Sequence, residues 1–156
     1  MKKRLLAFLI ASLMMTSIST ATNANIANPS ISPERWSTVA PHASSYLDDY
    51  SIAFGARDNC RMVITMDVNA PRTMDRIGCM TLTIENKIDG KWYECDTLVS
   101  ADYPEFIATN TASYFHSINY YGTAGVQYRV TMLAYARDSS GSDTGKVTSY
   151  VVTCRE

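Results

Sequence analysis

The sequence contains few of the residues on which enzyme and metal sites depend. It has only two histidines, His42 and His116, and neither a Gly-x-Ser-x-Gly nucleophile motif nor a Cys-x-x-Cys pair. Nucleophilic and acid–base catalysis need such groups in a defined structural setting. We therefore predict a protein that is not an enzyme, holds no metal and needs no cofactor.

Long apolar runs are also scarce, with one at the start of the chain. Met1–Arg4 is basic, Leu5–Met15 is apolar, and Thr16–Asn25 is small and polar. This order is typical of a secretory signal peptide, and the run is too short to span a membrane. We predict a signal peptide over residues 1–24, cleavage after Ala24, and a secreted, extracellular product without a membrane span.

Positive charge is not clustered anywhere in the exported part. Loss of Lys2, Lys3 and Arg4 lowers the basic count from 14 by three, which leaves an excess of four acidic residues over basic ones. Nucleic acids and anionic lipid surfaces bind through positive patches. The composition therefore argues against nucleic acid as a partner.

The four cysteines, Cys60, Cys79, Cys95 and Cys154, all follow the predicted signal peptide. An even number in an oxidising compartment indicates two disulfides, with three connectivities open. Antiparallel strand order favours Cys60 with Cys154, because the start of one strand and the end of the last strand lie at the same end of a sheet. The remaining pair, Cys79 with Cys95, would then cross a hairpin.

The clearest strand pattern lies at Gly125–Ala136, where apolar and polar residues alternate as in a strand with one buried face. Cys60–Asn69 alternates in the same way. Ile77–Glu85 and Trp92–Ser100 flank an Asp-Gly turn and predict a hairpin, with a bulge near Cys95. The predicted core is Met62, Ile64, Val68, Leu82, Ile84, Trp92, Tyr128, Val130 and Met132, and Met80 is expected on the same face as Leu82 and Ile84.

Other segments complete an all-β domain. Asn110–Tyr121 and Val147–Cys154 read as strands, Ser51–Phe54 as an edge strand, and Arg137–Lys146 as a polar loop. About seven short strands without intervening helices predict an immunoglobulin-like antiparallel β-sandwich over residues 39–156. Residues 25–38 are expected to form a flexible lead-in that is pinned by packing of Trp36.

Tyrosine is the one enriched residue type that suits binding, with ten in the chain. The alternation directs Tyr135, Tyr150 and one of Tyr120 and Tyr121 outward, and we select Tyr121. An exposed aromatic strip can stack on sugars or anchor a protein interface. Cross-strand packing is the alternative role for the same side chains.

Five short motifs are spread over the chain: Arg35-Trp36, the strand-opening Cys60, Ile-Gly-x-Met-x-Leu at Ile77–Leu82, Gly-x-Trp at Gly90–Trp92, and Gly-x-x-Tyr-Arg-Val at Gly125–Val130. Together they resemble an uncharacterised family of small secreted immunoglobulin-like proteins of Gram-positive gut anaerobes. These marks are core and turn positions. The resemblance therefore implies the fold and a bacterial, secreted protein, and it implies no activity.

The first functional hypothesis is a secreted, non-catalytic binding module for an extracellular protein or glycan. A secreted effector or antimicrobial protein that acts on neighbouring cells is an alternative. A third is a hydrolase that uses His116, which lies between Ser113 and Ser117 in the sequence.

Overall fold

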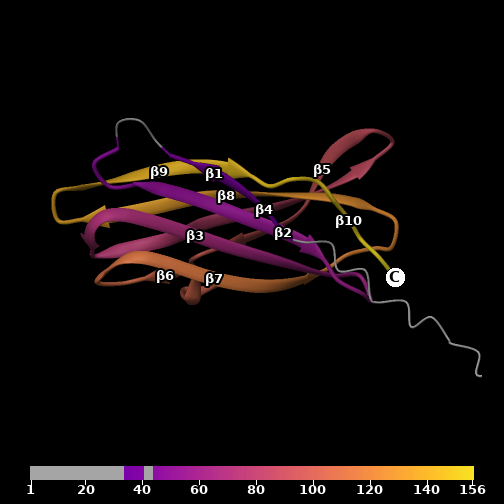
Figure 1. Cartoon of the computed structure of the whole chain (residues 1–156), viewed down its shortest axis with the longest axis horizontal. Helices are drawn as coiled ribbons and strands as arrows, with labels where there is room; N and C mark the ends of the chain where they lie inside the picture. The colour runs from indigo at the N-terminus through magenta and orange to yellow at the C-terminus, as the bar shows by residue number, and fades with distance from the viewer. Residues whose placement is uncertain (1–33, 41–43) are drawn as a thin grey trace, which may run out of the picture.

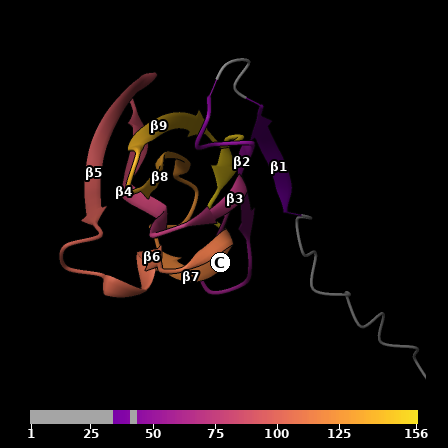
Figure 2. The same cartoon turned by 90° about the vertical axis from the view of Figure 1, so that its left-hand side faces the viewer.

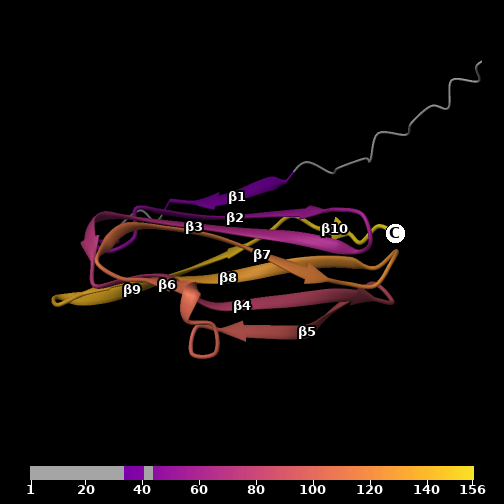
Figure 3. The same cartoon turned by 90° about the horizontal axis from the view of Figure 1, so that it is seen from below.

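The computed structural model describes residues 34–40 and 44–156 and shows an all-β sandwich of two antiparallel sheets (Figure 3). Sheet A has the order β1 (Arg35–Val39), β2 (Asp49–Ala56), β3 (Arg61–Met74) and β7 (Thr111–Tyr121). Sheet B has the order β10 (Val152–Thr153), β8 (Gln127–Asp138), β4 (Arg76–Ile88) and β5 (Lys91–Val99), with β9 (Gly141–Thr148) on β8 and β6 (Ile107–Ala108) on β4.

The one helical element among the described residues is a short 3-10 turn, η1 (Pro104–Phe106). Within the described ranges, no helix is long and apolar enough to cross a membrane. The predicted signal peptide, most of the predicted lead-in and His42 lie outside the described residues.

The core lies between β3 of sheet A and β8 of sheet B. The expected alternation is confirmed from Met62 to Val68 in β3 and from Tyr128 to Ala136 in β8, where every second side chain is fully or almost fully buried. Burial of one such side chain contributes roughly 1.5 to 3 kcal/mol, which favours this register of the two strands. The buried members of the predicted core are Met62, Ile64, Val68, Leu82, Ile84, Tyr128, Val130 and Met132.

The predicted hairpin joins β4 to β5 through Asp89 and Gly90. Both residues have positive φ, 50° and 80°, as a two-residue hairpin turn with the right twist requires. The register shifts between Ile84 and Glu85, and this shift leaves Cys95 without a partner on β4. The bulge predicted near Cys95 is therefore confirmed.

Two side chains expected in the core are wrongly assigned. A second register shift, between Cys79 and Thr81, buries Cys79 and turns Met80 outward, where it is 41% exposed. Trp92 is half-buried on the outer face of sheet B, where the Arg129 guanidinium lies 4.5 Å from its ring centroid. Both changes follow from bulges, which reverse the side of the sheet that later residues face.

The predicted N-terminal boundary and edge strand need correction. Residues 35–38, assigned to the lead-in, belong to β1, and β1 pairs with all but the ends of β2. The predicted edge strand at Ser51–Phe54 is thus an interior strand between β1 and β3. Trp36 lies on the outer face of β1 and is 44% exposed, so it does not pin the segment by burial.

The segment predicted as a polar loop, Arg137–Lys146, is mainly strand. Residues 141–148 form β9, which pairs with β8 along the upper margin of Figure 1. A side chain at Gly145 would collide with the ring of Tyr50, so glycine there permits β9 to approach sheet A closely. Pairing and close approach, rather than an apolar pattern, make this segment a strand.

Candidate functional site

The three tyrosines selected as binding residues do not form one strip. Tyr135 is half-buried on sheet B, between Gly78 of β4 and Thr144 of β9. Tyr121 is 67% exposed at the end of β7 in sheet A. Tyr150 is 43% exposed and follows β9. Their outward positions on different parts of the sandwich exclude a shared aromatic platform.

Tyr150 lines a pocket. The pocket has a volume of about 270 Å³ and lies where the edge strand of sheet A, β1, comes near the C-terminal segment at the edge of sheet B. In the end-on view, β1 stands at the side of the sandwich (Figure 2). The lining residues are Arg35, Phe54, Tyr150, Val151, Val152, Thr153 and Arg155.

Hydrogen bonds of Ser149 hold Tyr150 in place. The buried Ser149 hydroxyl accepts a bond from the N–H of Val130 at 2.9 Å and donates one to the carbonyl of Tyr150 at 2.9 Å. The N–H of Ser149 also donates to the carbonyl of Val130 at 2.8 Å. Ser149 therefore bridges the interruption between β9 and β10 and presents the next side chain at the pocket.

Two arginines line the pocket. The Arg35 guanidinium lies 4.0 Å from the ring centroid of Tyr150, in cation–π contact, and Arg35 is exposed. Arg155 lines the same pocket. Val151, which is 50% exposed, supplies apolar surface, whereas Phe54, which is paired with Arg35 across β1 and β2, lines the pocket but is only 1% exposed. The pocket thus combines cationic, aromatic and aliphatic groups.

Two cysteines meet beside the C-terminal segment. Cys60 and Cys154 approach to 2.8 Å without a disulfide between them. The N–H of Cys60 donates to the carbonyl of Arg155 at 2.6 Å, and the N–H of Cys154 donates to the carbonyl of Val126 at 2.9 Å. Burial, together with the neighbouring Cys60, raises the pKa of the Cys154 thiol to about 12. The backbone therefore positions this pair independently of a covalent bond.

The predicted pairing of Cys79 with Cys95 is wrong. Cys95 is the bulged residue of β5 and lies opposite Ile84 and Glu85, whereas Cys79 is five residues before Ile84 on β4, about 17 Å away along the strand. A disulfide needs Cα atoms within about 7 Å. Burial raises the pKa of the Cys79 thiol to about 12. Cys95 instead donates to the carbonyl of Ile84 at 3.4 Å.

His116 faces the interior rather than a serine. Its ring centroid lies 6.1 Å from that of Phe106 and 6.2 Å from that of Tyr114. Ser117, the next residue on the strand, points to the other face and shares a hydrogen bond of 2.8 Å with Thr65. Strand alternation therefore separates His116 from its serine neighbours, and the geometry offers no Ser–His pair.

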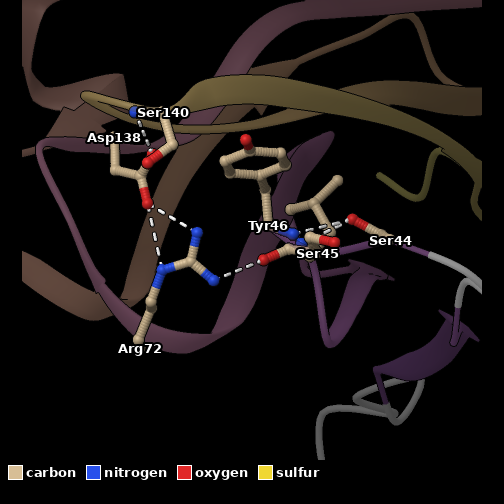
Figure 4. A network of polar contacts seen from close by, with 7 residues as sticks. Ser44, Ser45, Tyr46, Arg72, Asp138 and Ser140 are labelled. Carbon is tan, nitrogen blue, oxygen red and sulfur yellow. Dashed lines mark hydrogen bonds and ion pairs between the residues drawn. The ribbon is translucent and has the colours of Figure 1, made fainter.

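Asp138 lies in the segment predicted as a polar loop, Arg137–Lys146, and its carboxylate has a structural role. Arg72 donates through Nε and Nη2 to Asp138 Oδ2, at 3.0 and 2.6 Å, and through Nη1 to the carbonyl of Ser45 at 2.9 Å (Figure 4). Asp138 Oδ1 accepts the N–H of Ser140. The hydrogen bonds from Arg72 lower the pKa of Asp138. Among the described residues, no group of three or more His, Cys, Asp or Glu side chains could hold a metal.

The sequence reasoning missed Arg35 and Arg155. Nothing in their local sequence indicates that they share a pocket, because they lie at opposite ends of the domain and meet only through the fold. The outward-facing Tyr150 next to a strand end could be predicted from the sequence, and it identifies only one wall of the pocket.

Comparison with protein-family models and with curated proteins gives no match to this chain. The resemblance to a family of secreted proteins therefore stays a prediction, and the functional argument rests on the pocket.

Proposed function

We propose that the protein is a secreted, non-catalytic binding module that recognises an extracellular protein or glycan through the pocket at Arg35 and Tyr150. The observation that carries this proposal is the stacked Arg35–Tyr150 pair within a concave site of about 270 Å³. Concave sites with apolar walls and a few oriented polar groups are the usual form of ligand sites. Export follows from the predicted signal peptide over residues 1–24.

The chemistry of the pocket favours an anionic group on the ligand. A guanidinium that stacks on an aromatic ring keeps its N–H donors in the plane, where they suit a carboxylate. The excess of acidic residues in the exported chain would repel anions elsewhere, so the exposed Arg35 guanidinium in the pocket provides a local exception. Val151 would contact an apolar part of the same ligand. An acidic sugar or an acidic side chain of a protein meets these conditions.

The test is binding of residues 25–156 to an array that carries acidic glycans, matched neutral glycans and mucosal proteins. We expect binding to acidic members, and we expect Arg35→Ala and Tyr150→Ala each to lower the affinity at least about tenfold, a loss of about 1.4 kcal/mol. Tyr135→Ala is the matched control, because Tyr135 lies on sheet B away from the pocket lining.

Two results would contradict the proposal. Equal loss of binding in Tyr135→Ala and Tyr150→Ala would remove the pocket as the binding site. Absence of any bound ligand would favour the alternative of an effector or antimicrobial protein, which is tested by adding the purified protein to competitor cultures.

We further propose that Cys60 and Cys154 form a disulfide in the exported protein. Their close approach supports this bond, and so does the backbone of Cys60, which has a positive φ of 52°. A non-glycine residue in this region costs about 1 to 2 kcal/mol. A cross-link between the turn after β2 and the C-terminal segment would offset that cost.

A further inference from the structure

The edge of sheet A formed by β7 lacks the features that keep edge strands from pairing. Within the described part of the chain, β7 pairs only with β3, and it forms the lower margin of the sandwich (Figure 1). Edge strands normally avoid association through short length, charged side chains, proline or bulges. β7 has 11 residues, none of which is Lys, Arg, Asp, Glu, Pro or Gly.

The other edge strands all carry such protection. β1 has 5 residues and β10 has 2. β5 carries Lys91, Glu94 and Asp96 as well as the bulge at Cys95. β9 carries Asp143 and Lys146 and two glycines. The contrast within one molecule singles out β7 as the edge that is open to another strand.

Several large side chains of β7 are also exposed or only partly buried. On the outer face, Phe115 is 66% and Tyr121 is 67% exposed. On the inner face, Ile118 and Tyr120 are only partly buried against the core. A strand added beside β7 would cover both faces at once.

The direction of the backbone groups is set by the pairing with β3. The N–H of Gly122 donates to the carbonyl of Cys60 at 3.0 Å, and the register is regular from Tyr121 back to Ser113. In an antiparallel ladder, backbone groups of successive residues point alternately to the two neighbours. The odd-numbered residues from Ser113 to Tyr121 therefore direct their N–H and C=O groups to the open edge.

We infer that β7 pairs with β7 of a second copy of this chain, antiparallel and about a two-fold axis near Ser117. The open segment, residues 113–121, has Ser117 at its midpoint, so this register uses all of it and forms about ten backbone hydrogen bonds. It sets Phe115 beside Asn119 of the partner subunit, and Tyr114 beside Tyr120 of the partner subunit. Inner faces meet inner faces, and no like charges oppose one another.

Self-pairing, rather than a foreign strand, follows from this pattern. An isologous contact requires a surface that is complementary to itself. β7 meets that requirement because Tyr114 and Tyr120 lie three residues to either side of Ser117 on the inner face, and because none of its residues is Lys, Arg, Asp or Glu, whose charge would repel a copy. The dimer would join two copies of sheet A into one sheet of eight strands.

The test is sedimentation of residues 25–156 over a concentration series that reaches the submillimolar range. We expect the unaltered protein to sediment with the mass of two chains. Ser117→Lys and Ser117→Asp should each sediment as one chain, because each sets two like charges opposite one another at the axis. An equimolar mixture of the two variants should recover the mass of two chains. Thr38→Lys, which adds the same charge on the exposed edge strand β1, is the control and should stay dimeric.

Circular dichroism and thermal melts of every variant establish that each is folded, so that loss of the dimer is not loss of the domain. The inference is overturned if the unaltered protein sediments as one chain throughout the series. It is also overturned if the mixture of charge variants stays at one chain, or if the mass grows without limit, since open growth excludes a closed two-fold contact.

Discussion

Replacement of Cys154 by serine tests the proposed disulfide between Cys60 and Cys154. Of the substitutions considered, it should lower the free energy of unfolding the most. Joining Cys60 to Cys154 closes a loop of about 95 residues in the unfolded chain, and the chain-entropy relation gives a stabilisation of about 4.7 kcal/mol for a loop of that length. A domain of this size has a total unfolding free energy of about 5 to 15 kcal/mol. The variant should therefore lose a third or more of its stability.

The folded structure should survive this change. The N–H of Cys154 still donates to the carbonyl of Val126 at 2.9 Å, and the N–H of Gly125 still donates to the carbonyl of Cys154 at 3.0 Å. Both bonds belong to the backbone and are kept in a serine variant. The loss should consequently arise mainly from the greater freedom of the unfolded chain.

Urea unfolding, followed by tryptophan fluorescence, measures the effect. With a denaturant slope of about 1 to 3 kcal/mol/M, a loss of 4.7 kcal/mol lowers the midpoint by at least about 1.5 M. A reductant should shift the unaltered protein to the midpoint of Cys154→Ser and leave the variant unchanged. Cys95→Ser is the control, because Cys95 has no cysteine within reach across its hairpin.

Alkylation with mass detection checks the same prediction independently. Without reductant, Cys95, which is exposed, should react in the folded protein, and Cys79, which is buried, only after unfolding. Reaction of Cys60 and Cys154 in the unfolded, unreduced protein would refute the disulfide. Equal midpoints for the unaltered protein and Cys154→Ser would refute it as well.

Two further changes have signed outcomes. Arg129 lowers the pKa of Glu85 through hydrogen bonds of 2.7 and 2.8 Å, so the pair stabilises the fold above the ordinary pKa of 4.5, and this contribution is lost as pH falls through the lowered pKa. In urea titrations at different pH values, Glu85→Gln should flatten the dependence of stability on pH below about pH 4.5. An unchanged slope would contradict a stabilising role of the Glu85–Arg129 pair. Gly145→Ala should cost about 1 to 3 kcal/mol in thermal or urea unfolding, because the new methyl group meets the Tyr50 ring, and a neutral result would show that β9 lies farther from sheet A.

The strands that the sequence predicts well are those in which buried apolar and exposed polar side chains alternate along the chain. β3 and β8 alternate through the core, and the Asp89-Gly90 turn carries its own conformational signature. The prediction fails at Met80 because a bulge changes the side of the sheet, and a bulge adds one residue without a distinct local pattern. Local periodicity therefore predicts the fold class better than the facing of each residue.

Edge strands and the pocket depend on partners that are distant in the sequence. β1 and β9 have weak apolar patterns and become strands because β2 and β8 supply their hydrogen bonds. The erroneous pairing of Cys79 with Cys95 has the same origin, since strand register, not the presence of a hairpin, sets which residues face each other. The pocket itself joins Arg35 to Arg155, and no local signal links them.

Because Arg35 and Arg155 are far apart in the sequence, the two walls of the pocket form at different times during synthesis. Its walls come from the first described strand and from the segment around β10, so neither wall is functional until the intervening strands have assembled. During vectorial synthesis, β1 emerges early, and the pocket stays incomplete until residues 150–155 have joined the fold. Any ligand that the pocket binds would therefore bind only the completely assembled domain, and not an incompletely synthesised or C-terminally clipped chain.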